Sequence, residues 1–352
     1  MFAGRKKSTV GLDIGANTVK LVKLDHIKTG YIVSGMGMRE LPSEAIVSDE
    51  VRDRDAVIFN IQALIDQVDP KIRDVHVSVS GHGVITDKFT IDRKTGAEAE
   101  QAIIFETEQR APFDIDDVTL DYHVSQTHEE ENKMDVLMVA ARNEFLDGYL
   151  ELVQECDLRP TMVDIDAFAA LNAYEFNYDI DPERTTAIVN VGHDVTNICY
   201  LLDGKLHSTR DVSAGVREIF NSIQKEFRLN LELATKAIKG ELGDSVDQDM
   251  LKATIVTASD ELIAGIEQAF TYFKSQSKAP QIDWIVLSGG GALVPYLAEH
   301  LQAKLAIPIE MLNPLRGIEY DPQMFEYLQP EKIAPMLAVP IGLALRRAKK
   351  KK

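Results

Sequence analysis

Cysteine is scarce in this sequence of 352 residues, which contains only Cys156 and Cys199. The two stand far apart, without a CxxC spacing or a histidine at metal-ligand spacing. Disulfide frameworks and zinc sites require several closely spaced ligands. We therefore expect neither of them, and so few cysteines suit a reducing cytoplasm.

Long apolar runs are lacking as well. The longest uncharged run, 333–345, has about 13 residues, whereas a membrane-spanning helix needs about 20. We interpret this run as a core helix. The basic start, 1–8, precedes a strand pattern rather than an apolar signal region, so we expect no secretory signal. We interpret the basic tail, Arg346, Arg347 and 349–352, as a solvated chain end, with attraction to anionic lipid as the alternative.

Positive charge is also in short supply. The chain has 38 Lys and Arg against 56 Asp and Glu, a formal net charge of −18. Nucleic-acid-binding proteins carry basic patches and recognisable modules, so we expect no nucleic-acid partner. The 45% hydrophobic and 27% charged content is typical of a globular protein, and the length suggests two domains.

The stretch 10–24 has a strand, a turn and a second strand. Apolar residues alternate on both sides of Gly15, which permits the backbone angles of a tight turn. The exposed N–H groups of such a turn can hold a polyphosphate, while Asp13 could hold a metal ion through water. The polar residues beside the turn are Asn17, Thr18 and Lys20. An ordinary hairpin is the alternative for this stretch alone.

The same pattern recurs later in the chain. Residues 190–202 repeat strand, turn and strand, with Gly192 matching Gly15 and Asn190 in the place of Asp13. A third glycine cluster, 289–291, joins an apolar strand pattern to an expected helix. Three such loops in this order resemble the phosphate 1, phosphate 2 and adenosine motifs of the actin-like ATPase superfamily. The resemblance implies two related α/β domains that close on ATP and Mg²⁺.

An inserted unit interrupts the first domain. After an expected strand at 75–80, the pattern predicts a helix at 97–110, strands at 118–124 and 134–140, and a helix at 143–156. No catalytic group stands out in this helix–strand–strand–helix unit, so we expect it to bind a partner. The remaining pattern predicts helices at 214–227 and 231–239, one long helix at 247–275, and a closing helix at 338–345 packed on the first domain.

Longer stretches are similar to the PilM family of type IV pilus assembly proteins, which is similar in turn to the cell-division protein FtsA. These stretches are GLDIGANTVKLVKL, EQRAPFDIDDVTLDYHV, VDIDAFAALNAYE, IQKEFRLNLELA, IDWIVLSGGGALVPYL and AVPIGLALR. The APFDIDDVTLDY and IQKEF segments discriminate this family. The glycine loops alone would also fit sugar kinases, DnaK-type chaperones and MreB-type filament proteins.

The family resemblance implies an actin-like ATPase fold with an inserted 1C-type subdomain. On this basis 1–83, continued at about 159–185 and 333–352, is the first domain (1A), 84–158 is subdomain 1C, and 186–332 is the second domain (2A/2B). The resemblance further implies ATP and Mg²⁺ as cofactors and the cytoplasmic N-terminal peptide of PilN as partner. Other pilus platform proteins, pilus motor ATPases and self-association are further expected contacts. The expected location is cytoplasmic, peripheral at the inner membrane through partners.

The family's site residues carry over position by position. Phosphate 1 matches at Asp13, Gly15, Asn17, Thr18 and Lys20, although Ala16 stands where many relatives have Ser. Phosphate 2 keeps Gly192, Asp194 and Thr196, and the adenosine loop keeps Gly289, Gly290 and Gly291. Lys236 or Lys239 stands where an AExxK-like helix would flank adenine, but a solvated helix face is the favoured interpretation of both.

Asn190 occupies the position of the superfamily's usual Asp and lacks the charge that helps to hold Mg²⁺ and orient water. We therefore expect no catalytic residue there, and weak or no ATP turnover. The resemblance favours an assembly adaptor that uses ATP to fix its shape. The alternatives are an FtsA-like filament-forming protein and a sugar kinase, although the neighbourhood of His207, Asp211 and Ser213 has no sugar-binding signature.

Overall fold

The computed structural model describes residues 8–48, 50–110, 114–277, 279, 281–325 and 330–346. The basic start, the tail from Arg347 onward and Ala111, Pro112 and Phe113 of the insert therefore lie outside the described residues. Within these ranges, no helix has both the length and the apolar character needed to cross a membrane.

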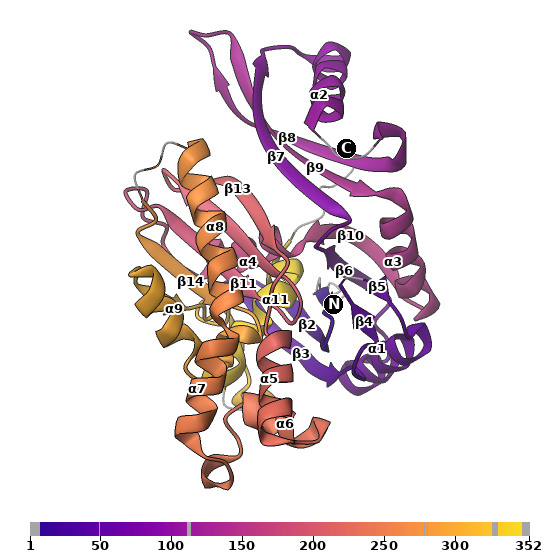
Figure 1. The fold of residues 1–352 in the computed structure, drawn as a ribbon. Coiled ribbons are helices and arrows are strands. Elements are labelled where there is room, and N and C mark those ends of the chain that lie inside the picture. The colour runs from indigo at the N-terminus through magenta and orange to yellow at the C-terminus, as the bar shows by residue number, and fades with distance from the viewer. Residues whose placement is uncertain are drawn as a thin grey trace.

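Six strands form the first sheet in the order β10-β6-β1-β2-β3-β16 (Figure 1). Their bounds are β1 Ser8–Ile14, β2 Thr18–Ile27, β3 Gly30–Glu40, β6 Asp74–Val79, β10 Arg159–Ile165 and β16 Glu319–Tyr320. Strands β1, β2 and β3 pair antiparallel, whereas β1, β6 and β10 run parallel. The central strand β1 is buried along most of its length, as expected where helices cover both faces of a parallel region.

The second sheet repeats this arrangement in the order β13-β12-β11-β14-β15. Its strands are β11 Thr186–Val191, β12 Thr196–Leu202, β13 Lys205–Val212, β14 Trp284–Ser288 and β15 Ile309–Met311. Here too the first three strands pair antiparallel and the others run parallel to β11. The repeated order and directions confirm the expectation of two related α/β domains.

Two helices cover one face of the first sheet. These are α1, Arg54–Val68, and α3, Asn143–Glu155, and a short hairpin of β4, Ile46–Val47, and β5, Glu50–Val51, lies beside them. The fully buried Leu152 and Val153 of α3 share a core with Val57 and Ile61 of α1. Since α3 was expected in the insert, its packing differs from that expectation, and we propose an insert boundary near Arg142.

The insert is a three-stranded sheet with one helix against it, and it projects from the two larger sheets (Figure 1). Its elements are β7 Val84–Asp92, α2 Gly96–Arg110, β8 Val118–His128 and β9 Lys133–Arg142, in the sheet order β7-β9-β8. The expected helix and two strands are present. Strand β7 was not predicted, because half-buried polar and apolar residues are mixed along it.

The helices α4, Asp166–Asn177, and α11, Ala338–Leu345, pack against each other between the two sheets. A Cβ atom at Gly342 would lie 1.7 Å from the carbonyl oxygen of Ala169, so this contact requires glycine. A Cβ atom at Gly11 in β1 would likewise lie 2.0 Å from the Pro340 carbonyl oxygen. These contacts confirm that the closing helix packs on the first domain.

The second domain carries α5 Arg217–Phe227, α6 Leu231–Ile238, α7 Gln248–Ala258, α8 Asp260–Ser277 and α9 Leu297–Leu305. A short helix, α10, spans Pro330–Ile333. The prediction of one long helix over 247–275 is wrong, because α7 ends before Ser259. The buried hydroxyl of Ser259 donates to the carbonyl oxygen of Val256 at 2.9 Å, and a side-chain bond of this kind competes with the continuing helix.

Candidate functional site

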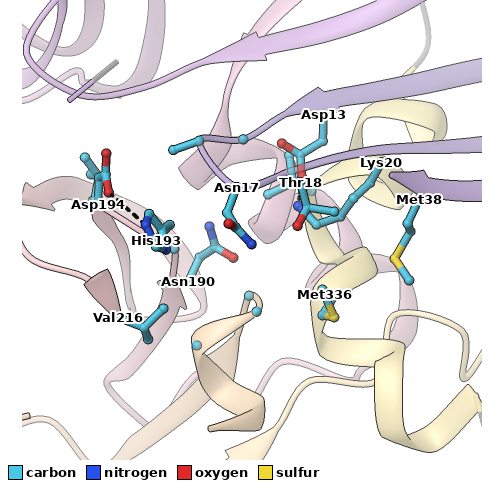
Figure 2. A pocket seen from close by; sticks show the side chains of 18 of the residues that line it. Asp13, Asn17, Thr18, Lys20, Met38, Asn190, His193, Asp194, Val216 and Met336 are labelled. Atoms are coloured by element: carbon cyan, nitrogen blue, oxygen red, sulfur yellow. Dashed lines mark hydrogen bonds and ion pairs between the residues drawn. The ribbon is translucent and has the colours of Figure 1, made fainter. Parts of the chain in front are cut away.

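A cleft of about 940 Å³ lies where the turns of the two matching hairpins meet (Figure 2). Strands from both domains reach it at the ends where open α/β sheets bind ligands. All but two of the expected ATP-binding residues line it: Asp13, Gly15, Asn17, Thr18, Lys20, Asn190, Gly192, Asp194, Lys239, Gly289, Gly290 and Gly291. The fold therefore gathers three distant sequence segments around one cavity.

The two hairpins occupy equivalent positions in their sheets. In the first, Asp13 faces Lys20 across the ladder, and the Gly15 N–H donates to the Thr18 carbonyl oxygen at 3.2 Å. In the second, Asn190 faces Asn197, and the turn closes through a 3.0 Å hydrogen bond from the Gly192 N–H. The ion pair of the first hairpin is thus replaced by two amides in the second.

The first hairpin places a buried ion pair in the cleft. Lys20 Nζ lies 2.8 Å from Asp13 Oδ2, and each side chain is only about a tenth exposed. Asn17 and Thr18 line the same cleft (Figure 2). A bound phosphate would therefore meet a lysine whose charge is already balanced by a carboxylate, and that carboxylate faces the same cavity.

The second hairpin holds Asn190 in a chain of hydrogen bonds. Its side-chain oxygen accepts from Ser288 Oγ at 3.3 Å, and its amide donates to Asn197 Oδ1 at 3.2 Å. Asn197 Nδ2 donates to Asp211 Oδ1 at 2.9 Å, and Asp211 Oδ2 accepts from the Gly81 N–H at 2.9 Å. Desolvation raises the pKa of the Asp211 carboxyl, while its bonds to Asn197 and Gly81 oppose the rise. Both ends of the Asn190 amide are thus engaged by the protein.

Asp194 bridges the two domains. Its Oδ2 atom accepts from the Ser48 N–H of the β4–β5 hairpin at 3.0 Å and from the Arg217 guanidinium of α5. Its Oδ1 atom is buried and has no hydrogen-bond partner among the described residues, and it lies 3.7 Å from His193 Nε2 (Figure 2). Desolvation lowers the pKa of His193, although Asp194 opposes this effect. The main structural role of Asp194 is therefore to join the two domains.

The third loop depends on two glycines for its shape and exposes another. Gly289 has a φ of +87°, and a Cβ atom there would lie 2.3 Å from the Val191 carbonyl oxygen. At Gly291 a Cβ atom would lie 2.3 Å from Val191 Cγ1. At Gly290 the nearest atom would be Met336 Cε at 3.8 Å, so this position opens into the cleft. Gly290 is the loop residue that a ligand can approach most freely.

Two expected residues lie elsewhere. Thr196 is fully buried, and its hydroxyl donates to the Ala214 carbonyl oxygen at 2.7 Å. Lys236 points along its own helix to Glu232, 2.7 Å away. Lys239 does line the cleft, and its Nζ lies 2.6 Å from Oε1 of Glu40 in the first domain.

Sequence reasoning missed Asp166, which begins α4 and lines the cleft. Desolvation, followed by the negative charge of Asp13, raises the pKa of Asp166 to about 7. A carboxyl with such a pKa can take up or release a proton near neutral pH, which is the property of a general base. The available signal was an acidic residue directly after a parallel strand, where ligands bind in open α/β sheets.

The residues considered for a sugar kinase do not gather in the cleft. The His207 ring packs edge-on against Phe273 with 5.2 Å between centroids. Ser213 Oγ lies 3.2 Å from His82 Nε2, and Asp211 belongs to the hydrogen-bond chain from Asn190. Among the described residues, no three His, Cys, Asp or Glu side chains cluster closely enough to hold a metal by themselves.

Comparison with known proteins places these features in a family. A sequence model of the family described as type IV pilus assembly protein PilM matches residues 11–348. The chain is 25% identical to one in a structure titled "PilM-PilN type IV pilus biogenesis complex", with a TM-score of 0.84, covering 97% of this chain and 98% of that one. It is 13% identical to the ethanolamine utilization protein EutJ of Carboxydothermus hydrogenoformans, with a TM-score of 0.57, covering 97% and 90%. The expected actin-like ATPase fold is confirmed.

Proposed function

This chain belongs to the PilM family of type IV pilus assembly proteins, and from this membership we propose that it is an ATP-binding adaptor that holds the cytoplasmic N-terminal peptide of PilN. The observation that carries the proposal is the meeting of three glycine loops at one interdomain cleft. Its volume of about 940 Å³ suits a ligand of nucleotide size.

The residues of the cleft fit ATP and Mg²⁺. Backbone N–H groups of the turns at Gly15 and Gly192 would receive the phosphates, with Lys20 beside them. Mg²⁺ usually keeps several waters and binds through one or two carboxylates together with phosphate oxygens. Asp13 supplies such a carboxylate, so the absence of a protein-only metal cluster among the described residues agrees with metal held chiefly by the nucleotide.

We propose slow turnover as part of the same function. Asn190 is neutral and already bonded to Ser288 and Asn197, so it cannot supply the charge that positions metal and water. Asp194 is a poor substitute, because Arg217 and Ser48 hold its carboxylate at the domain boundary. The other acidic residues that line the cleft are Asp166, Glu40 and Glu241. ATP that persists would hold the domains closed without a chemical step.

The insert is the proposed wall of the PilN site. It projects from the body of the protein (Figure 1), and an extended peptide can bind such a unit through a strand edge or a neighbouring groove. The solved complex named above contains PilM and PilN, and its likeness to this chain extends over 97% of the residues. We further propose that other pilus platform proteins and pilus motor ATPases contact this adaptor, and that it works in the cytoplasm at the inner membrane.

Fluorescence anisotropy tests the proposal directly. A labelled synthetic peptide of the PilN cytoplasmic N-terminus is titrated with the full chain, with and without ATP and Mg²⁺, beside a scrambled peptide of equal composition. We expect saturable binding of the native peptide only. Failure to bind it in both nucleotide conditions, with folding verified by circular dichroism, would overturn the adaptor function.

A further inference from the structure

Strand β8 is an exposed edge of the insert sheet. Within the described part of the chain it pairs with β9 alone, and every residue from Asp121 to Thr127 is exposed. Tyr122 is 39% and Val124 37% exposed, and both are large apolar side chains on this one strand. The opposite edge strand, β7, lies against β13 of the second domain, where Thr86 Oγ1 and Thr209 Oγ1 are 2.5 Å apart. An open edge of this kind is a template for pairing with another strand.

The residues around the middle of β8 can form complementary pairs with the same residues of a second, antiparallel β8 strand. From Leu120 the strand reads Leu, Asp, Tyr, His, Val. In an antiparallel pair centred on Tyr122, Asp121 of one copy faces His123 of the other, and Leu120 faces Val124. We propose that β8 pairs antiparallel with β8 of a second copy of this chain, with the two-fold axis at Tyr122.

The existing register places these pairs on two distinct faces. Tyr122 and Val124 stand opposite Met138 and Val136 of β9, which belong to the apolar core beneath α2. Across the joined edges, the Leu120–Val124 and Tyr122–Tyr122 contacts extend that apolar face from one copy into the next. Both insert helices then lie on the same face of one six-stranded sheet.

The other face carries the polar pairs. Asp121 and His123 stand opposite Val139 and Leu137 of β9, and neither forms an ion pair within the described part of the chain. Asp121 Oδ1 accepts from the Tyr122 N–H at 2.9 Å, so in the single chain this carboxylate holds a main-chain donor of β8. In the dimer the Tyr122 N–H would bond to the partner strand, and the carboxylate would turn to His123 of the other copy.

The structure also limits the extent of pairing. The β8–β9 register shifts between Val124 and Gln126, and a bulge of this kind bends the strand away from a flat edge. The matched segment is therefore the five residues centred on Tyr122. Such a short interface predicts a weak, reversible dimer rather than a filament, because the two-fold pairing uses the β8 edge of each copy once.

Cysteine cross-linking tests the register. Antiparallel partners have Cα atoms about 4.5–5.5 Å apart, which falls within the disulfide range. Cys156 and Cys199 are buried, so the wild-type chain provides the background. Tyr122→Cys should form a disulfide dimer under mild oxidation. Phe105→Cys, an exposed position on α2 of the same insert, is the matched control and should remain monomeric.

Mixed cysteines make the test specific. Asp121→Cys and His123→Cys should cross-link poorly alone but form a mixed disulfide when combined. A Tyr122→Cys chain that stays monomeric, or that cross-links no faster than Phe105→Cys, would overturn the proposal. The register would also be contradicted if Asp121→Cys chains cross-linked with one another as fast as they cross-link with His123→Cys chains.

Charge exchange provides a second measurement without cysteine. Asp121→Lys places lysine opposite His123 at two symmetric contacts and should weaken dimerisation about tenfold in analytical ultracentrifugation. The double variant Asp121→Lys/His123→Glu restores opposite charges and should recover the wild-type constant. A wild-type chain that sediments as a monomer at all concentrations would overturn the pairing, even if β8 bound a PilN peptide instead.

Discussion

Asn190 donates its side-chain amide to Asn197 at 3.2 Å, at the ladder position where the first hairpin has the Asp13–Lys20 ion pair. The two hairpins are therefore alike in backbone but different in charge. In the first, a carboxylate and an ammonium group face the cleft. In the second, a neutral amide pair continues into Asp211 and the Gly81 N–H at the root of the insert.

Asn190→Asp should raise the rate of ATP hydrolysis. A restored carboxylate would strengthen metal retention and orient the attacking water, and one well-placed electrostatic contact is worth about 100- to 1,000-fold in rate. Single-turnover hydrolysis compares the variant with wild type. A brisk wild-type rate that the substitution leaves unchanged would contradict the role of Asn190.

The same substitution should lower stability. The carboxylate introduced by Asn190→Asp would face the side-chain oxygen of Asn197, whose amide is committed to Asp211, so two acceptors would meet in a buried place. An unsatisfied buried polar group costs about 1–3 kcal/mol. Urea denaturation of nucleotide-free wild type and Asn190→Asp measures this loss of stability. The measurement separates a folding defect of the variant from a change in its hydrolysis rate.

Gly290→Asp should abolish stabilisation by ATP without unfolding the protein. Its side chain would enter the open part of the cleft, where Met336 Cε, 3.8 Å from the new Cβ atom, is the nearest atom of the described residues apart from the chain neighbours. A ligand bound only by the native state raises the free energy of unfolding, so ATP with Mg²⁺ should raise the melting temperature of wild type alone. A variant that gained as much as wild type would show that the nucleotide binds elsewhere.

Gly289→Ala, at the neighbouring position of the same loop, should destabilise the protein itself, in contrast to Gly290→Asp. A Cβ atom there would meet a carbonyl oxygen at 2.3 Å in a left-handed backbone conformation, so we expect a loss of about 2 kcal/mol or more before any ligand is added. The two neighbouring substitutions should thus distinguish the glycine needed for the backbone shape of the loop from the glycine that faces the ligand.

Much of the fold could be predicted because its signals are local. The alternation around Gly15 and Gly192 determines the two hairpins, and the uncharged run at 338–345 determines α11. Strand β7 escaped prediction because its half-buried polar residues, such as Thr86, acquire their burial from β13 of the other domain. The pattern of polar and apolar residues within one segment cannot reveal a contact with another domain.

The site was only partly predictable for the same reason. Glycine is typical of tight turns, so the sequence predicted the three loops at Gly15, Gly192 and 289–291. Asp166 was missed because its altered pKa arises from desolvation and from Asp13, which is far away in sequence. Lys236 and Lys239 look alike in sequence, and only the helix orientation directs one to Glu232 and the other to the cleft and Glu40.

Lys239→Ala should speed nucleotide release, whereas Lys236→Ala should not. The Lys239–Glu40 contact joins the two domains beside the cleft, while the Lys236–Glu232 contact lies within one helix. Since exposed ion pairs contribute up to about 1 kcal/mol, the effect should be no more than about fivefold. Stopped-flow release of a fluorescent ATP analogue measures it, and equal rates for the two variants would exclude a role for the Lys239 contact.

Asp166→Asn should change how stability depends on pH. The folded-state pKa of Asp166, about 7, lies above the ordinary value of 3.8, so between these values the folded protein retains a proton that the unfolded chain releases. This group's contribution to stability is therefore full below about pH 4 and is lost as the pH rises toward 7.

Urea denaturation at several pH values checks the sign. The stability of Asp166→Asn relative to wild type should increase from pH 4 to pH 7 and then level off, because the amide does not titrate. Parallel curves for the two proteins would mean that the Asp166 carboxyl titrates in its usual range.

Removal of the insert should abolish binding of the PilN peptide while ATP binding survives. The structure indicates where to cut: the Arg142 N–H donates to the Gly83 carbonyl oxygen at 2.9 Å, so a short Gly-Ser link can replace 84–141. Helix α3 must remain, because Leu152 and Val153 complete the first-domain core. The thermal shift with ATP and Mg²⁺ reports folding of the shortened chain, and peptide anisotropy reports the partner site. Unchanged peptide affinity in a chain that still responds to ATP would place the peptide outside the insert and leave self-pairing through β8 as the insert's use.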